Sequence, residues 1–389
     1  MSKKFEKGVK HSHVYKTSFL FIAVSVILAC SSLWVNRPNL CQYCDKIAVL
    51  MYSAAIGLFV SSLLWMVLWR KKEKEWTKYL WVVIIFLFAI QFITLFTYDY
   101  DLDGIIHTYY TWRIYDGAMP YRDFIIMDNP LSYYVFSPLL HIIPETYHVY
   151  ALRVVMFIFY FLILFFVYKT YKLLEKEKRF GLVAVLLLMS QGWFFANMFI
   201  VRPDVPMTFL ILVSIYFEIK YLKSPKPAKL SWAGFFSGLA YLTKQKSLFV
   251  VPGQVLGLVQ FKKWKPSSLT SLIKEGVWFF WPFLVLILAG LAWLFYNGTL
   301  WKYYLYAMQL PFLVDMGYSV WNNVFSIVFA FNILFWGLSV FACIYFLRNR
   351  KASTNLLLWA LASYLFLFIM LIARNPTAHY FLPILPILA

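Results

Sequence analysis

The amino-acid sequence predicts an all-helical protein that crosses a membrane many times. Of the 389 residues, 62% are hydrophobic and only 14% are charged, whereas soluble chains carry about 45–50% apolar and about 25% charged residues. Apolar windows such as 79–97 and 276–296 reach the roughly 20 residues that a helix needs to cross a hydrocarbon core. Similar windows recur along the chain, so we expect a polytopic membrane protein of about 11–13 helices.

The distribution of charge predicts the topology. The formal net charge is +19, and most Lys and Arg residues form short clusters between the apolar windows. These clusters are KKFEKGVK, RKKEKEWTK, KTYKLLEKEKR, KYLKSPKPAK, KKWKPSSLTSLIK and RNRK. Cytoplasmic loops accumulate Lys and Arg because positive flanks resist translocation. We therefore expect a cytoplasmic N-terminus, and we attribute the positive charge to topology rather than to nucleic-acid binding.

This orientation assigns the membrane-spanning segments in order. We expect spans near 17–35, 47–69, 79–98, 131–143, 149–168, 181–200, 205–221, 231–243, 247–261, 276–296, 324–347 and 354–373, with another beginning at about 380. Three of them (131–143, 231–243 and 247–261) are short for full crossings, so tilting or joining to neighbours is expected. Polar segments at 99–130, 200–206 and 297–323 then face outward. Helices must supply the spanning structure, because lipid satisfies no backbone polar group.

The sequence offers no clear metal site. Cys41 and Cys44 form a single CQYC in a small external loop, without the second pair or nearby His that a zinc site requires. The two thiols are interpreted as incidental, with a disulfide as the alternative in an oxidising compartment. No cofactor is predicted, although a divalent cation beside the acidic segment 99–128 stays open because carboxylates suit hard cations.

Six of the 17 acidic residues lie between positions 99 and 128. Asp99, Asp116 and Asp128 are explained as solvated loop residues. Asp103 differs, because it follows a span and begins a run typical of an interfacial helix, where Tyr and Trp are favoured. His107 is one helical turn further on and is expected to share a face with Asp103. A lone His is more often an ordinary hydrogen-bonded surface group.

A carboxylate at a membrane boundary suits one particular chemistry. Partial removal from water raises its affinity for a proton, so it can accept one from a hydroxyl group. Inverting sugar transfer uses one carboxylate to activate the acceptor while the leaving group departs on the opposite face. If the leaving group is already a phosphate, the protein needs cations to hold it rather than a general acid.

Suitable cations are present near the outer ends of the predicted spans. Lys244 lies between two apolar runs, where a charged side chain is costly and often functional. Arg202 and Arg374 occupy outer ends of spans, and a guanidinium can grip a phosphate through two hydrogen bonds. Asp204 is either an ion-pair partner for Arg202 or a second acid lining the site.

Several short stretches resemble polyprenyl-phosphate-sugar-dependent glycosyltransferases of the GT-C fold, above all the protein O-mannosyltransferase and aminoarabinose-transferase branch. The stretches are DG at 103–104, GAMPYRDF at 117–124, NPL at 129–131, RPD at 202–204, GLAYLTK at 238–244 and HYFLPILP at 379–386. The resemblance covers about 79–389. It implies a GT-C-like transmembrane module over 79–389, preceded by a two-helix hairpin at 1–78.

The resemblance also implies roles for individual residues. Asp103 matches the catalytic carboxylate of the first large external loop, and Lys244 matches the lysine that contacts the lipid phosphate. Arg202 and Asp204 correspond to positions lining the site. The remaining candidates for substrate binding are Arg374, Tyr380, His107, Tyr121 and Asp123. Gly104 departs from the pattern, because an acid usually follows the catalytic Asp, and the stop at Ala389 suggests a short C-terminus.

The leading hypothesis is therefore an integral membrane glycosyltransferase, most simply in a bacterial plasma membrane. It would move a sugar, with inversion, from a polyprenyl-phosphate carrier to a hydroxyl acceptor at the outer face. The acceptor could be a protein, a glycan or a lipid, and no nucleic-acid partner is expected. Two alternatives stay open, namely a transporter or lipid flippase, and a GT-C-like protein without catalytic activity. Transporters often show paired repeats and broken helices at mid-membrane, which this sequence does not display.

Overall fold

The computed structural model describes residues 73–97, 101–174, 178–261, 266–313, 333–348, 351–372 and 382–389. In these ranges all regular secondary structure is helical, and one isolated β-bridge pairs Pro120 with Phe124. The predicted all-helical membrane architecture is confirmed. Some of the features predicted above lie outside the described residues, namely nearly all of the 1–78 hairpin, Cys41, Cys44, Asp99, Arg374 and Tyr380.

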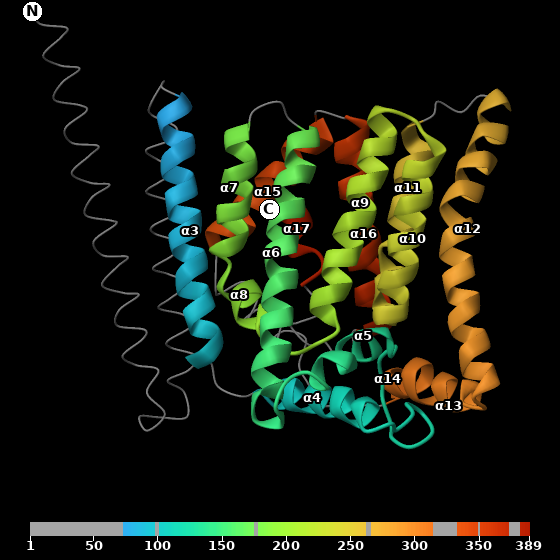
Figure 1. The fold of residues 1–389 in the computed structure, drawn as a ribbon. Helices are drawn as coiled ribbons and strands as arrows, with labels where there is room; N and C mark the ends of the chain where they lie inside the picture. Colours follow the sequence, from blue (N-terminus) through green and yellow to red (C-terminus); the bar gives the residue numbers. More distant parts are fainter. Residues whose placement is uncertain are drawn as a thin grey trace, which may run out of the picture.

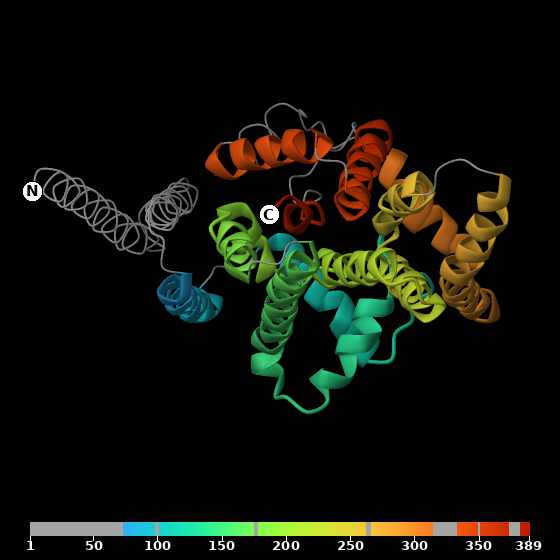
Figure 2. The same ribbon diagram turned by 90° about the horizontal axis from the view of Figure 1, so that it is seen from above.

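Long helices run side by side and form the body of the molecule (Figure 1). They are α3 (Glu73–Thr97), α6 (His148–Leu174), α7 (Lys178–Met189), α9 (Asp204–Lys223), α10 (Pro227–Thr243), α11 (Val251–Phe261), α12 (Pro266–Tyr296), α15 (Ile333–Arg348) and α16 (Ala352–Ile372). Among the described residues, 145–174, 204–223 and 270–296 are long and apolar enough to cross a membrane. Seen from above, α3 and α12 lie at opposite edges, with α15 and α16 along a third side (Figure 2).

The remaining elements, apart from α17, lie toward one end of this bundle. They are α4 (Leu102–Tyr115), α5 (Leu131–Leu140), η1 (Glu145–Tyr147), α8 (Gly192–Met198), η2 (Gln245–Phe249), α13 (Leu300–Tyr303), η3 (Tyr304–Gln309) and α14 (Leu310–Leu313), whereas α17 (Leu385–Leu388) ends the chain nearer its middle. The helix expected to begin near Asp103 is present as α4, which runs across the end of the long helices (Figure 1).

The predicted span at 131–143 is wrong. α5 has ten residues, which corresponds to about 15 Å at the helical rise per residue, so it cannot cross a hydrocarbon core. It lies at the same end of the bundle as α4 (Figure 1). Its apolar side chains Tyr133, Phe136 and Leu140 are buried by protein, which explains why an apolar stretch here does not indicate a crossing.

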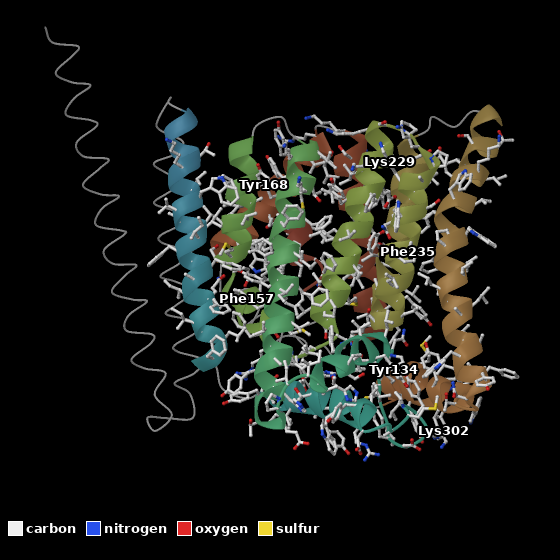
Figure 3. The ribbon with its side chains drawn as sticks, viewed as in Figure 1. Tyr134, Phe157, Tyr168, Lys229, Phe235 and Lys302 are labelled. Atoms are coloured by element: carbon white, nitrogen blue, oxygen red, sulfur yellow. The ribbon has the colours of Figure 1, made fainter. Side chains whose placement is uncertain are left out.

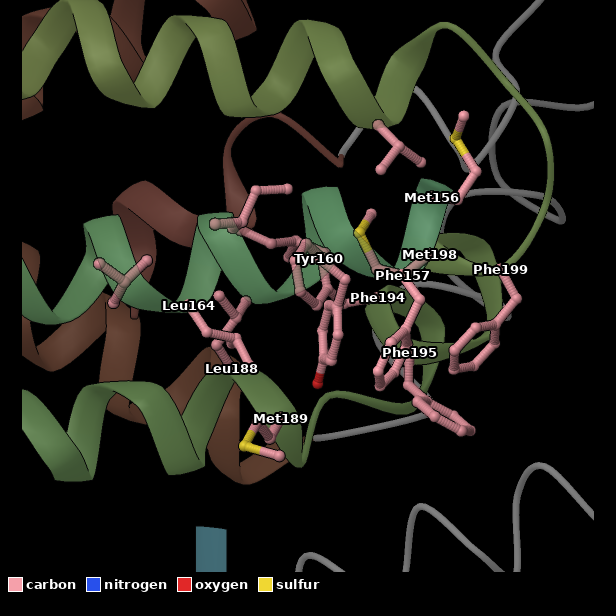
Figure 4. Close-up of a cluster of buried hydrophobic side chains, with 14 of the residues drawn as sticks. Met156, Phe157, Tyr160, Leu164, Leu188, Met189, Phe194, Phe195, Met198 and Phe199 are labelled. Atoms are coloured by element: carbon pink, nitrogen blue, oxygen red, sulfur yellow. The ribbon is translucent and has the colours of Figure 1, made fainter. Parts of the chain in front are cut away.

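The largest hydrophobic core surrounds α6. Figure 4 shows side chains of α6, α7 and α8 in contact, among them Met156, Phe157, Tyr160, Leu188 and Phe194. The core also holds one satisfied polar pair, because the Tyr160 hydroxyl donates to Gln91 Oε1 at 2.7 Å. Since buried polar groups are stable only when hydrogen-bonded, this pair fixes α3 against α6 at a defined height.

Helices α10 and α12 approach each other closely at a glycine. A methyl group at Gly234 would lie 1.8 Å from the carbonyl oxygen of Phe279, so only glycine permits this distance between the two backbones. Small residues allow such close packing of helices in membranes. This contact holds α10 firmly, and α10 ends immediately before Lys244.

The two ends of the bundle differ in character. Lys229, at the start of α10, lies at the end opposite to Tyr134 and Lys302, which lie near α4 (Figure 3). The last turn of α9 carries Lys220 and Lys223 at the same end as Lys229. The basic cluster at 220–229 is therefore separated from α4 by the full length of α9 and α10.

Candidate functional site

Six acidic and basic side chains converge where α4 crosses the end of the long helices. We call them the charged cluster: Asp101, Asp103, Asp128, Arg202, Asp204 and Lys244. They come from the start of α4, the loop before α5, the turn before α9, the first residue of α9 and the residue after α10. Segments that are far apart in the sequence thus meet at one end of the bundle.

Arg202 joins the start of α4 to the start of α9. Its Nη2 lies 2.5 Å from Asp101 Oδ2 and 2.8 Å from Asp103 Oδ2, and its Nη1 donates to Asn197 Oδ1 at 3.0 Å. The Arg202 side chain is only 7% exposed, whereas that of Asp103 is 43% exposed. The Arg202 guanidinium is therefore buried and held by its hydrogen bonds, while the Asp103 carboxylate stays accessible to a ligand.

Lys244 forms the second centre of the cluster. Its Nζ lies 2.6 Å from Asp204 Oδ2 and 3.4 Å from Asp128 Oδ1, and its side chain is 4% exposed. The position follows from the local fold, because α10 ends at Thr243 and Lys244 leaves the helix in an extended conformation. A cation at a helix C-terminus is also favoured by the helix dipole.

The expectation that Asp128 is a solvated loop residue is wrong, whereas Asp116 is exposed as expected. Asp128 is 9% exposed and faces Lys244. The loop is folded inward by Tyr121, whose hydroxyl donates to the Asp128 carbonyl at 2.6 Å. Tyr121 is 1% exposed and has a φ of 66°, an unfavourable backbone conformation for a non-glycine residue that surrounding packing must maintain.

His107 lies on α4 and adjoins the charged cluster. Its Nδ1 is 2.7 Å from the Tyr133 hydroxyl, and the two rings are stacked at 17°. Burial lowers the pKa of His107 from 6.5 to about 4, opposed by Asp128 and Asp204 and assisted by Lys244 and Arg202. The imidazole is thus neutral at pH 7 and adjoins the acidic and basic side chains of the charged cluster.

Asp123 belongs to a separate turn. Its carboxylate receives hydrogen bonds from Arg122 at 2.9 Å and from the Met119 backbone N–H at 2.8 Å. The hydrogen bond from Arg122, followed by that from Met119, lowers the pKa of Asp123 to about 2. These contacts stabilise the loop between α4 and α5, and Asp123 makes no ion pair with Lys244 or Arg202, so its role in substrate binding stays a prediction.

Gly104 occupies the place where the resembled family usually has an acid. A methyl group there would come within 3.3 Å of Ile200 Cγ2. The start of α4 therefore packs tightly on the segment that leads to Arg202, and a larger residue would require Ile200 to shift by a few tenths of an ångström. The close contact with Ile200 therefore favours a small residue at position 104, where the family pattern has an acid.

An apolar cavity of about 230 Å³ lies between α5, α10 and α12, and its lining includes sequence neighbours of two residues of the charged cluster. It is lined by Asn129, Pro130, Leu131, Tyr134, Tyr241, Leu242, Ile287, Gly290, Leu291, Trp293, Leu294 and Tyr303. Asn129 follows Asp128 directly and donates to the Tyr241 carbonyl, while Tyr241 precedes Lys244 by about one turn. Residues of the cavity wall thus lie close in sequence to Asp128 and Lys244, which face each other in the cluster.

Of the predicted candidates, Asp103, His107, Arg202, Asp204 and Lys244 lie in or beside the charged cluster. The sequence interpretation missed Asp101, Asp128 and Tyr133. Asp101 was detectable as a second acid two residues before Asp103, but nothing in the sequence indicated that Asp128 turns inward. Within the described ranges, no three His, Cys, Asp or Glu side chains are arranged to hold a metal ion.

Comparison with known proteins gives a match to a protein-family model. A family model described as dolichyl-phosphate-mannose-protein mannosyltransferase matches residues 128–296, which is less than half of the chain. The matched segment contains Asp128, Arg202, Asp204 and Lys244, and it begins after Asp103. Searches of curated proteins and of solved structures give no match. The match supports a glycosyltransferase family of the GT-C type, as the sequence motifs predicted.

Proposed function

Because the matched segment supports a membrane glycosyltransferase of the GT-C type, we propose that this protein transfers a sugar from a polyprenyl-phosphate carrier to a hydroxyl acceptor. Transfer inverts the anomeric carbon and takes place at the outer face of the membrane. The observation that carries the proposal is the charged cluster, in which an accessible carboxylate and two buried cations lie beside an apolar cavity.

Asp103 is the proposed base. The acceptor oxygen attacks the anomeric carbon and forms a new C–O bond, while the acceptor proton passes to the Asp103 carboxylate. The bond between the anomeric carbon and the phosphate oxygen breaks, and the phosphate leaves with its polyprenyl chain. The accessibility of Asp103, at 43% of its side chain, supports this role because a base must reach the proton that it accepts.

Lys244 and Arg202 are the proposed phosphate contacts. Each is buried and already paired with carboxylates, Lys244 with Asp204 and Asp128, and Arg202 with Asp101 and Asp103. The carboxylates hold the two cations at fixed positions, and an arriving phosphate would compete for the same N–H donors. Negative charge that develops on the leaving phosphate is then stabilised by groups that are already in place.

The apolar cavity is the proposed site for the first isoprene units of the carrier. Its lining is almost entirely hydrocarbon and aromatic, and burial of each CH₂ group contributes about 0.8 kcal/mol. A carrier seated there would present its phosphate toward Lys244, since Tyr241 in the cavity wall belongs to the last turn of α10 and Lys244 directly follows that helix.

The outer-face location is inferred from the two ends of the bundle. The Lys-rich cluster at 220–229 and the charged cluster lie at opposite ends of α9 and α10. If the basic end is cytoplasmic, as the positive-inside tendency requires, the charged cluster faces the other side. A cysteine introduced at exposed Asp116 should then react with a membrane-impermeant maleimide in intact cells.

The decisive experiment is Asp103→Asn assayed for sugar transfer in membranes with a polyprenyl-phosphate sugar. Loss of a general base lowers such rates by about 10²–10⁴-fold, whereas binding of the carrier should change little. Asp116→Asn is the matched control, because Asp116 lies at the exposed end of the same helix. Full activity of Asp103→Asn would rule out the proposed base.

A further inference from the structure

The hydrogen bond between His107 and Tyr133 determines which imidazole nitrogen carries the proton. A tyrosine hydroxyl keeps its proton at neutral pH, since its ordinary pKa is about 10. Tyr133 is 2% exposed, and among the described residues the only partner of its hydroxyl is His107 Nδ1 at 2.7 Å. A buried donor without an acceptor is destabilising. Tyr133 therefore donates to Nδ1, which must be the unprotonated nitrogen.

A neutral imidazole with an unprotonated Nδ1 carries its proton on Nε2. The pKa of His107, lowered to about 4 mainly by burial, keeps the ring in this neutral form at physiological pH. In the opposite tautomer Nδ1 would donate to Tyr133, and the tyrosine proton would have no acceptor within the described part of the chain. Tyr133 thus selects the Nε2–H form of His107.

The surroundings of His107 indicate what this N–H group can bind. Charges of Asp128, Lys244, Asp204 and Arg202 act on the ring, and Tyr133 and Tyr110 contact it. Within the described residues Nε2 has no hydrogen-bond partner, and the side chain retains some exposure. The Nε2–H group of His107 is therefore available as a hydrogen-bond donor beside the charged cluster.

We propose that Tyr133 is a positioning residue, and that it holds His107 as an Nε2–H donor to an oxygen of the carrier phosphate. This inference rests on the proposed function. A phosphate oxygen is an acceptor that carries no proton at neutral pH, so it matches a nitrogen that can only donate. As the bond to the anomeric carbon breaks, charge accumulates on the leaving oxygen and the hydrogen bond strengthens, while the proton stays on Nε2.

The first test measures the tautomer without any turnover. The full-length protein in nanodiscs, with ¹⁵N-labelled histidine, has six histidines, and His107→Gln identifies the resonances of His107. We expect a neutral ring with its proton on Nε2 at pH 7, and a mixture of tautomers in Tyr133→Phe. A ring protonated on Nδ1 at pH 7, or an unchanged tautomer in Tyr133→Phe, would overturn the proposal.

The second test measures binding of synthetic undecaprenyl phosphate, with undecaprenol as the probe that lacks the phosphate. A hydrogen bond to a charged group corresponds to a change of about tenfold or more in affinity. We expect His107→Phe to weaken binding of the phosphate by about tenfold, and His107→Gln, whose amide can still donate, to stay within about threefold. Binding of undecaprenol should not change, and Tyr109→Phe, an exposed tyrosine on the same helix, should match the parent.

Kinetics separates this inference from the proposed function. If the parent protein transfers sugar, Tyr133→Phe should lower kcat more than it raises KM, because the hydrogen bond is strongest as the phosphate leaves. Equal phosphate binding by the parent and His107→Phe overturns the inference alone. Phosphate binding that depends on His107 in a parent that transfers no sugar from any carrier supports the inference and overturns the proposed function.

Discussion

The Nζ atom of Lys244 lies 2.6 Å from Asp204 Oδ2, in a pair whose side chains are 4% and 1% exposed. Asp204 begins α9 and Lys244 follows the end of α10, so the contact joins two helices at the same height. Charges that are removed from water to this extent depend on each other, because neither can be solvated if its partner is lost. The pair is therefore both a structural link and the electrostatic centre of the charged cluster.

Asp204→Asn should destabilise the protein. Removal of one partner from a buried ion pair costs about 3–5 kcal/mol, and Asp128, at 3.4 Å from Lys244, should reduce the loss toward the lower value. The measurement is the apparent melting temperature in detergent. Asp123→Asn is the comparison, because its ion pair with Arg122 is exposed and solvent screens such pairs, so the smaller loss is expected there. Equal melting temperatures for both variants would contradict the role given to Asp204.

Arg202→Lys should impair transfer despite the conserved charge. The Arg202 guanidinium contacts Asp101, Asp103 and Asn197 at once, and a lysine ammonium cannot reproduce this planar arrangement of donors. We expect kcat/KM to fall by about tenfold or more, because the start of α4 and with it Asp103 would lose their fixed position. Arg113→Lys, in the last turn of α4, serves as the control and should retain activity.

A larger side chain can fill the apolar cavity without changing the charged cluster. Ile287→Trp adds a large side chain to the cavity wall, so we expect KM for a long-chain carrier to rise by about tenfold, which is the loss of roughly two buried CH₂ groups. The KM for a short, water-soluble phosphate analogue should be the same in Ile287→Trp as in the parent protein. Leu288→Trp is the matched control, because Leu288 is 61% exposed on the same helix. If both variants discriminate equally against long chains, the cavity does not hold the carrier.

Gly234→Ala should loosen the contact between α10 and α12. The added methyl group would lie 1.8 Å from the Phe279 carbonyl oxygen, so the helices must separate, and overpacking of this kind costs about 1–3 kcal/mol. Gly276→Ala on α12 meets nothing within 4 Å and should leave the melting temperature unchanged. A Gly234→Ala protein as stable as Gly276→Ala would show that the close approach is dispensable.

The lowered pKa of His107 predicts a loss of stability in acid. The unfolded chain takes up this proton near pH 6.5, whereas the folded protein stays neutral until about pH 4. Between these values the unfolded state binds more protons, so stability falls as the pH is lowered through this window. With about 1.4 kcal/mol per pKa unit, and with a reduction for partial exposure, we expect a loss of about 1–2 kcal/mol.

The measurement is the melting temperature between pH 7 and pH 4.5 for the parent, His107→Gln and His141→Gln. His107→Gln should show the smaller decrease on acidification, since it has no imidazole to charge. His141 is exposed, so His141→Gln is the control for replacing an imidazole at the surface. Identical profiles for the parent and His107→Gln would mean that the ring is not held neutral by burial.

The amino-acid sequence alone determined the class of the molecule. Long apolar windows must become helices in a membrane, because no other element satisfies its own backbone there, and this prediction holds for α6, α9 and α12. The position of Lys244 between two apolar runs also predicts a functional charge, and that role stays a prediction. The same logic failed at 131–143, where apolar side chains are buried by protein instead of lipid, and hydropathy does not distinguish the two surroundings.

The packing of the helices and loops selects which polar groups meet. Asp128 and Asp116 are both acids in one polar loop, yet one faces Lys244 and the other is exposed, because the Tyr121 hydroxyl binds the Asp128 carbonyl and turns that part of the loop inward. Likewise, Tyr133 controls the proton of His107 from 26 positions away. Side-chain hydrogen bonds act over about 3 Å in space and leave no periodic pattern along the chain, so sequence fixes the helices and their packing selects the site.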